Sequence, residues 1–204
     1  MCIRDSLRSE TTVKVFDQMR KLQGFTDEGS PGRDWNVATG MVIEGKAGFQ
    51  IMGDWAKGEF TAAGKVPGVD YYCAATPSNN GYLYNVDSFI FYKTSDPDKQ
   101  AGQKLLAKLM MGKNFQKVFN LYKGSIPARL DVPMDEFDKC AKTSNSDIKT
   151  AGASGGLVPS FAHGMAQGNT MKAALQDVIT EHFNSDMSSV DAANALADSV
   201  LDNM

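Results

Sequence analysis

The chain has 204 residues, enough for one sizeable domain or two small ones, and its 42% hydrophobic and 22% charged residues are typical of a globular protein. Its 21 basic and 24 acidic residues give a net charge of −3 and a pI near 5.4, which argues against the clustered basic surface of a nucleic-acid-binding protein. No apolar run approaches the roughly 20 residues that span a bilayer, so the sequence predicts no membrane helix.

The first ten residues, MCIRDSLRSE, contain neither an apolar segment nor a small-residue cleavage site, so they are not a secretory signal peptide. MCIRDS resembles a leader that adapter sequence leaves on open reading frames from fragmentary environmental assemblies. We therefore interpret residues 1–10 as a non-native leader or a truncated start, and residues 11–204 as a chain that lacks its true beginning. On this interpretation, the absence of a signal peptide says nothing about the compartment.

The first half of the chain alternates short helical patterns with short strand patterns. Val13, Phe16, Met19 and Leu22 recur at helical spacing and predict an amphipathic helix over residues 10–25. After a turn-rich break, further helices are predicted over residues 35–46, capped by Asp34, and over residues 54–64, capped by Asp54 and closed by Gly64. Strands are predicted over residues 47–52, 69–77 and 88–94, with a loop over residues 78–87.

From Asp96 onward the pattern becomes helical. Asp96 caps a helix over residues 96–112, with Pro97 at its first position. The inward face of that helix is expected to consist of Leu105, Leu106, Leu109 and Met110. The remaining helices are predicted over residues 113–124, as two short helices within 132–152, over 169–186, and over 189–204 with Ser189 or Asp191 as the cap; a Gly-rich loop is predicted over 154–168. Because three short strands do not easily make a sheet of their own, the pattern indicates half of a larger α/β protein.

Three cysteines are present, at Cys2, Cys73 and Cys140, and none belongs to a C-x-x-C motif or a His/Cys cluster with metal-ligand spacing. We therefore expect no zinc or iron–sulfur site, no other metal and no cofactor. Since Cys2 lies in the suspected leader, two cysteines remain. Cys73 and Cys140 are either two partly buried thiols or a disulfide formed in an oxidising compartment.

Two tryptophans lie where loops meet helix N-termini, and each follows an aspartate directly. Trp35 and Trp55 are each either a core aromatic or a platform for a sugar ring, because an indole offers a flat apolar face and one N–H donor. Asp87, at a loop-to-strand junction, is either a turn or cap residue or an acceptor for two sugar hydroxyls. Lys123, taken in isolation, is a lysine at a helix C-terminus that interacts with the helix dipole.

The two histidines belong to no recognisable catalytic motif. His163 lies in a Gly-flanked loop, and His182 lies in mid-helix as a solvent-facing or core residue. No Ser or Cys nucleophile motif accompanies them, and Gly-rich phosphate-binding patterns are absent from the sequence. No pair of carboxylates stands out as the catalytic pair of a glycosidase.

Three segments in this order resemble one family: FQIMGDWAKGEF (49–60), SFIFYKTSDPDKQ (88–100) and LYKGSIPAR (121–129), before a helical tail. With them, residues 11–204 resemble the C-terminal half of extracellular solute-binding proteins of sugar ABC transporters, and most of all the glucose/mannose-binding branch. The resemblance implies an α/β fold of two lobes joined by hinge strands, with the sugar in the cleft between the lobes. The chain would be the helix-rich C-terminal lobe of this periplasmic-binding-protein fold with its hinge segments, and the N-terminal lobe would be missing.

The resemblance also implies the site: Trp35 and Trp55 as stacking platforms, and Asp87, Lys123 and, least securely matched, His163 as polar ligands. It implies a monomeric, non-enzymatic, substrate-binding subunit that delivers a glucose- or mannose-like monosaccharide to an ABC transporter permease and binds no nucleic acid. The location would be the periplasm, or the outside of the cell with a lipid anchor, and the signal peptide would have been lost with the missing half.

Because the N-terminal lobe normally contributes further ligands, the 204-residue chain is expected to bind sugar weakly or not at all. Two alternatives from other classes stay open. One is a glycoside-processing enzyme that uses similar aromatic and carboxylate side chains, and the other is a helical interaction domain without a small-molecule site.

Overall fold

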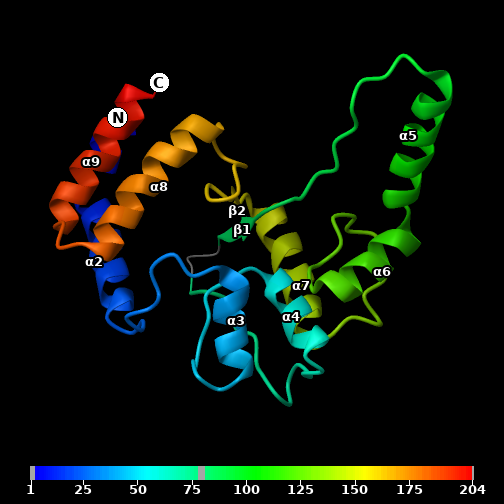
Figure 1. The fold of residues 1–204 in the computed structure, drawn as a ribbon, viewed down its shortest axis with the longest axis horizontal. Coiled ribbons are helices and arrows are strands. Elements are labelled where there is room, and N and C mark those ends of the chain that lie inside the picture. Colours follow the sequence, from blue (N-terminus) through cyan, green and yellow to red (C-terminus); the bar gives the residue numbers. More distant parts are fainter. Residues whose placement is uncertain (1–2, 78–80, 204) are drawn as a thin grey trace. The chain divides into compact units, whose positions relative to one another are not determined.

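The computed structural model describes residues 3–77 and 81–203, and these form two compact units (Figure 1). We call Met1–Arg33 with Pro159–Met204 the terminal unit, and Asp34–Val158 the central unit. The expected leader (1–10) and the expected loop (78–87) each lie partly outside the described residues. Within the described residues, no helix has the length and apolar character needed to cross a bilayer.

The terminal unit is built from helices. They are α1 (Ile3–Leu7), α2 (Glu10–Gln23), α8 (Asn169–Asn184) and α9 (Ser189–Asp202). α2, α8 and α9 pack against one another, and α1 packs against α9 (Figure 1). α2 and both tail helices were predicted, but the cap of α9 was assigned to the wrong residue: the Ser188 hydroxyl, at 3.1 Å, accepts the Asp191 amide proton.

The core of the terminal unit centres on Phe16, which is 2% exposed and packs against two buried alanines of α9. Val13 and Met19 lie at the edge of this core as predicted, whereas Leu22 is exposed. The reason is geometric: at 3.6 residues per turn, a strict three-residue repeat drifts by about 60° at each step. Leu22 therefore lies about 180° around the helix from Val13.

His182 is a core residue rather than a solvent-facing one. It is completely buried, and its ring meets the Phe16 ring edge-to-face at 4.8 Å between centroids. Among the described residues its Nδ1 has no hydrogen-bond partner, while its backbone carbonyl accepts a hydrogen bond from Arg20. Burial lowers the pKa of His182, the nearby Arg20 charge lowers it further, and Asp17 opposes both.

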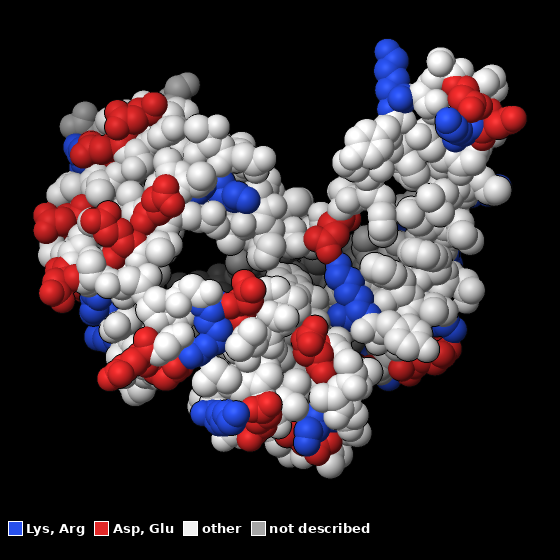
Figure 2. Space-filling model, viewed as in Figure 1, with Lys and Arg blue, Asp and Glu red and all other residues white. Residues whose placement is uncertain are grey.

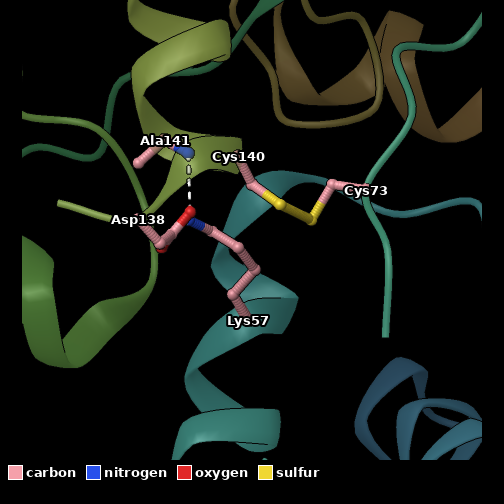
Figure 3. Close-up of a disulfide and its surroundings, with 5 residues drawn as sticks. All are labelled: Lys57, Cys73, Asp138, Cys140 and Ala141. Carbon is pink, nitrogen blue, oxygen red and sulfur yellow. Dashed lines mark hydrogen bonds and ion pairs between the residues drawn. A yellow bond between two sulfur atoms is a disulfide. The ribbon is translucent and has the colours of Figure 1, made fainter. Parts of the chain in front are cut away.

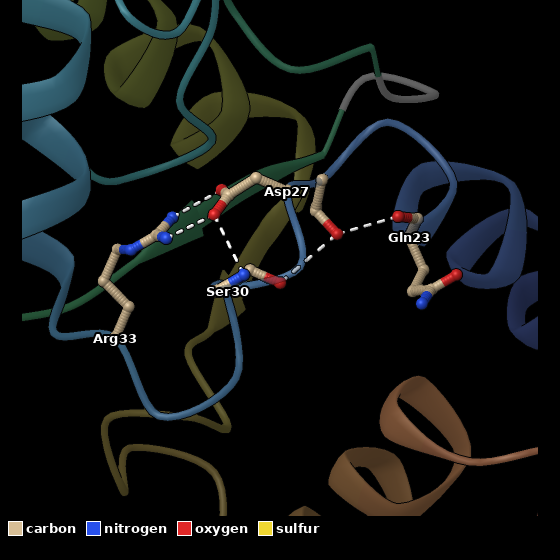
Figure 4. Close-up of polar contacts among 6 residues, drawn as sticks. Gln23, Asp27, Ser30 and Arg33 are labelled. Atoms are coloured by element: carbon tan, nitrogen blue, oxygen red, sulfur yellow. Dashed lines mark hydrogen bonds and ion pairs between the residues drawn. The ribbon is translucent and has the colours of Figure 1, made fainter.

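The turn predicted between the first two long helices is held by an exposed ion pair (Figure 4). Arg33 binds Asp27 through two parallel hydrogen bonds, of which Nη1 to Oδ2 measures 2.7 Å. The Ser30 amide donates to the Asp27 carbonyl at 3.0 Å and closes the turn. The hydrogen bonds from Arg33 lower the pKa of Asp27 to about 2 despite some desolvation.

The central unit contains most of the elements and a two-stranded sheet among its described residues. The elements are α3 (Trp35–Ile43), η1 (Asp54–Ala56), α4 (Lys57–Ala62), β1 (Tyr82–Tyr84), α5 (Pro97–Met110), α6 (Lys113–Lys123), α7 (Lys139–Ser154) and β2 (Leu157–Pro159), of which the last residue, Pro159, belongs to the terminal unit. β1 pairs with β2. At the start of β1, the Tyr82 amide donates a hydrogen bond to the carbonyl of Gly156, the residue before β2, at 2.9 Å. Both strands formed in segments predicted as loops.

None of the three predicted strands forms among the described residues. Residues 47–52 and 88–94 lie outside regular structure, and residues 69–77 contribute only an isolated bridge between Pro67 and Tyr71. Phe49 is 94% exposed, so the apolar run that suggested a buried strand is not buried in the described structure. A strand requires a neighbouring strand for its backbone groups, and these segments find none in the described chain.

The long helices of the central unit are largely where they were expected, with two corrections. Asp96 caps α5 by accepting the Asp98 amide proton at 2.9 Å, with Pro97 at the first position. The face predicted to point inward is exposed at Leu105, Leu106 and Leu109. The pair of short helices predicted within 132–152 is replaced by the single helix α7.

Cys73 and Cys140 are joined by a disulfide that ties an irregular segment to the first turn of α7 (Figure 3). Beside it, the buried Lys57 Nζ lies 2.7 Å from Asp138 Oδ2, and Asp138 Oδ1 accepts the Ala141 amide proton at 2.8 Å. Burial raises the pKa of Asp138, but the hydrogen bonds from Lys57 and Ala141 outweigh it and leave the pKa lowered. The start of α7 is therefore fixed by a covalent bond and by an ion pair.

We predict that replacing Cys73 with alanine destabilises the central unit. Cys73 and Cys140 are 67 residues apart, and opening a loop of that length costs about 2–4 kcal/mol of unfolding free energy. Tryptophan fluorescence during urea unfolding measures this, because Trp35 and Trp55 both lie in the central unit. Reductant should lower the stability of the parent chain but not of the variant, and equal stability of parent and variant would contradict the prediction.

We predict that the terminal unit loses stability in acid because of His182. Folding lowers the pKa of His182 from 6.5. The free energy of unfolding therefore keeps its full value above pH 6.5 and decreases as the pH falls toward the lowered pKa, because the folded state resists protonation of the buried ring. Hydrogen exchange of α8 and α9 amides between pH 7 and pH 5, corrected for intrinsic rates, measures the loss. His182→Leu should flatten this pH dependence, whereas His163→Leu, at the other histidine, should leave it unchanged.

Candidate functional site

Two segments that carried the family resemblance meet in space at a pair of glycines. α4 begins next to the C-terminal end of α6, and a Cβ atom on Gly58 would lie 2.8 Å from the Lys123 carbonyl oxygen. A Cβ atom on Gly124 would lie 2.5 Å from the Gly58 amide nitrogen, and Gly124 has a φ of +87°. The contact therefore requires glycine on both sides, and it brings GDWAKG together with KGSIPAR.

Asp54 stabilises this contact between α4 and the end of α6, and it does not act as the predicted helix cap. Its Oδ2 accepts the Ile126 amide proton at 3.0 Å, while Gly53 occupies the N-cap position of η1. Burial raises the pKa of Asp54, and the hydrogen bond from Ile126 and the charges of Lys57 and Lys123 oppose that rise. The carboxyl thus holds the turn after α6 against η1.

Trp55 is half-buried and is positioned by its own turn. A Cβ atom on Gly53 would lie 2.1 Å from the indole carbon Cζ3, so the ring lies directly against the Gly53 backbone. The strand predicted just before this turn, over residues 47–52, does not form among the described residues. The indole is therefore positioned by its contact with the Gly53 backbone.

Trp35 opens α3 and is 39% exposed. Its carbonyl accepts hydrogen bonds from Thr39 Oγ1 at 3.0 Å and from Gln50 Nε2 at 2.8 Å, which ties the first turn of α3 to the segment before η1. Asp34 takes the N-cap position as predicted, but its side chain makes no capping hydrogen bond. α3 packs against α4, so Trp35 starts a helix next to the one that follows Trp55.

Asp87 and Lys123 form an ion pair although they lie 36 residues apart. Asn85 Nδ2 also donates to Asp87 Oδ1 at 3.1 Å, and the Lys123 Nζ lies 5.8 Å from the centre of the Phe119 ring. The carboxylate is 61% exposed and the lysine 30% exposed, so both remain accessible to a polar ligand. The pair presents an acceptor and a donor side by side.

His163 belongs to the terminal unit, whereas Trp35, Trp55, Asp87 and Lys123 belong to the central unit. It is exposed, and its Nδ1 lies 2.7 Å from the hydroxyl of the buried Ser160. This contact fixes the ring within its own loop. Within the central unit, Asp87 and Lys123 are in direct contact.

The sequence interpretation missed the aromatic face beside Lys123. A pocket of about 530 Å³ is lined by Phe115, Val118, Phe119, Tyr122 and Lys123. The Phe119 ring stacks on Phe115 at 5.5 Å and meets Phe89 edge-to-face at 6.4 Å between centroids. The signal was present, because these residues recur at three- and four-residue intervals along α6.

On the face drawn in Figure 2, acidic and basic residues are interspersed and form no broad basic patch. Within residues 3–77 and 81–203, no group of three or more His, Cys, Asp or Glu side chains is arranged to hold a metal ion. The candidate residues of the central unit are two tryptophans and one exposed ion pair.

Comparison with known proteins gives a consistent result. Residues 4–145 match a family model described as "Bacterial extracellular solute-binding protein". The chain is 46% identical over 197 residues to a "Probable sugar-binding periplasmic protein" of Brucella suis, covering 96% of this chain and 47% of that protein. A protein of the same name from Rhizobium meliloti is 43% identical, with 96% and 47% covered. An uncharacterized ABC transporter extracellular-binding protein of Pyrococcus horikoshii is 33% identical, with 86% and 39% covered.

These relatives and the matched family are solute-binding proteins and not enzymes. The chain spans about half the length of the curated relatives it matches.

We predict that Gly124→Ala disrupts the junction between α4 and α6. The left-handed conformation costs about 1–2 kcal/mol for a non-glycine residue, and the clash with Gly58 adds about 1–3 kcal/mol. Gly155→Ala is the matched control, because Gly155 also ends a helix with φ +73° but has open space around it. Urea unfolding followed by tryptophan fluorescence should show the larger loss for Gly124→Ala; equal losses would contradict the close contact.

Proposed function

The chain belongs to the bacterial extracellular solute-binding proteins, and on this premise we propose that it forms part of the substrate-binding subunit of a sugar ABC importer. The observation that carries the proposal is the meeting of the Trp55 turn with the end of α6, where Lys123 pairs with Asp87. An aromatic face and a charged hydrogen-bonding pair are the two features that sugar recognition needs. The names of the relatives from Brucella suis and Rhizobium meliloti support sugar as the ligand class.

The site would recognise a monosaccharide through complementary surfaces. The indoles of Trp55 and Trp35 would stack on the C–H faces of the ring, which are apolar. Asp87 would accept hydrogen bonds from hydroxyls, and Lys123 would donate to them. A site that hydrogen-bonds a particular hydroxyl rejects an analogue that lacks it, so these groups would determine the stereochemistry that is accepted.

The sugar we propose is glucose or mannose. The resemblance of residues 49–60 and 121–129 to the glucose/mannose-binding branch supports this choice. Binding requires no bond cleavage, and the site accordingly needs hydrogen bonding and stacking rather than a nucleophile or a general base. The role of the protein would be to hold the sugar for transfer to the membrane permease.

We further propose that the chain represents the C-terminal lobe and hinge segments of a monomeric, two-lobed protein that works in the periplasm or outside the cell. The relatives are about twice as long as the matched region, which supports a second lobe that contributes further ligands. A ligand held by one wall of a cleft loses the contacts that closure of two lobes would add. The 204-residue chain alone should therefore bind sugar weakly.

We predict that the chain binds glucose or mannose with a Kd of about 1 mM or weaker, which corresponds to about −4 kcal/mol. Saturation-transfer NMR with each sugar measures binding in this range. Trp55→Ala should weaken binding at least tenfold, or by about 1.4 kcal/mol, because the ring loses its stacking surface. Asp87→Asn should weaken binding as well, since a neutral amide accepts hydroxyl protons less strongly than a carboxylate.

The control is Tyr72→Ala, which removes another exposed aromatic side chain of the central unit and should leave binding unchanged. Absence of saturation transfer to every monosaccharide would contradict a sugar site in this chain. Micromolar binding by the chain alone would contradict the contribution proposed for a second lobe.

A further inference from the structure

Residues 72–77 form an exposed segment whose attachment to the rest of the central unit depends on a covalent bond. All of these residues are exposed, and Tyr72 is 85% exposed. Within residues 3–77 and 81–203, no backbone hydrogen bond involves this segment. Its Cys73 forms the disulfide with Cys140 (Figure 3). We call residues 72–77 the tethered segment.

Just before the tethered segment, the chain is held by non-covalent contacts of Tyr71. The Tyr71 ring stacks on Phe60 of α4 at 4.1 Å between centroids, and the Tyr71 carbonyl accepts the Gly68 amide proton at 2.7 Å. Because the tethered segment begins at the next residue, breaking the disulfide would free the segment without disturbing these contacts.

The other end of the disulfide lies on a helix that has attachments of its own. Cys140 is the second residue of α7, and the N-cap residue Asp138 pairs with the buried Lys57 and accepts the Ala141 amide proton. Neither contact involves a sulfur atom. Breaking the disulfide should therefore leave the first turn of α7 in place.

The two cysteines differ in their accessibility and in the surroundings of the thiolate that each would form. Cys73 is exposed and Cys140 is half-buried, so a thiolate from solvent reaches Cys73 more readily. Attack at Cys73 releases Cys140 as a thiolate, which the positive N-terminal end of α7 stabilises. The negative charge of Asp138, two residues earlier, is paired with Lys57. Exposed disulfides are the labile ones, and a stabilised thiolate leaves faster.

We propose that the Cys73–Cys140 disulfide is a thiol–disulfide exchange site at which a small-molecule thiol acts on Cys73. In the first step, the thiolate sulfur of the small molecule bonds to Cys73 Sγ, and Cys140 leaves with the electron pair of the broken S–S bond. In the second step, another small-molecule thiolate attacks the sulfur of the attached molecule and releases Cys73 as a thiolate. The protein gains two electrons, two small thiols are oxidised to one disulfide, and the cysteine thiolates take up the two protons that these thiols lost.

Reduction changes the tethered segment from a fixed to a mobile state, while the rest of the central unit stays folded. The exchange site is therefore a redox switch for one exposed segment. It does not depend on the binding of sugar, so the outcome of a sugar-binding assay does not affect it.

The test of the reaction uses the oxidised chain with Cys2→Ser, in which Cys73 and Cys140 are the remaining cysteines. Glutathione is the probe, and iodoacetamide blocks the free thiols after a short incubation. Mass spectrometry of the digested protein should find glutathione on Cys73 at least ten times as often as on Cys140. Reduction through the unfolded chain would accelerate about fivefold or more in 1 M urea, and we expect a smaller change than that.

The test of the switch measures backbone order parameters by nitrogen-15 relaxation before and after reduction with dithiothreitol. The order parameters of residues 72–76 should fall below about 0.6, whereas those of residues 140–144 in α7 should stay near about 0.85. The matched control carries Cys2→Ser, Cys73→Ser and Cys140→Ser together. Its tethered segment should be equally mobile with and without dithiothreitol.

The proposal is wrong if glutathione attaches to Cys140 as often as to Cys73, or if reduction requires urea. It is also wrong if reduction leaves the order parameters of the tethered segment unchanged. Loss of order in the first turn of α7 on reduction would show that the disulfide holds the helix rather than the segment, and would overturn it as well.

Discussion

The close contact between Gly58 and Gly124 is the constraint on which the candidate site depends. With any side chain at either position, α4 and the end of α6 would separate, and Asp54 would lose its reach to the Ile126 amide. The contact places Trp55 one turn before Gly58 and Lys123 directly before Gly124. The positions of Trp55 and Lys123 thus depend on a close approach of two backbone segments, and backbone contacts tolerate less adjustment than contacts between flexible side chains.

Two ion pairs of the central unit differ in their exposure to solvent. Lys57 and Asp138 are paired next to the disulfide with the lysine buried, where the ion pair fixes the start of α7. Asp87 and Lys123 are paired at the surface, where solvent or a ligand's hydroxyls can replace the partner. An exposed pair contributes little stability, typically at most about 1 kcal/mol, so replacing it with contacts to a ligand would carry a small penalty.

Features encoded locally were predictable from the sequence. The Asp96–Pro97 start of α5 and the Lys113–Lys123 helix need only nearby residues, and both were predicted correctly. Features that depend on distant partners were not. The strands over 47–52 and 88–94 have no partner in the described chain, and the role of Asp54 depends on Ile126, which lies 72 residues away. The proposed site residues were chosen by resemblance, and the contact of Lys123 with Asp87 needed the folded chain.

The disulfide has a topological consequence. Cys73 and Cys140 close a covalent ring that contains β1, α5 and α6, together with Asp87 and Lys123. A protease that cuts once in the exposed stretch before α5 opens this ring but releases nothing, since both new ends stay attached through the sulfurs. Such a nicked molecule would stay covalently joined in an oxidising compartment, and a reductant would remove that covalent link. The chain between Asp87 and α5 can therefore be cleaved once while both resulting fragments stay joined through the disulfide.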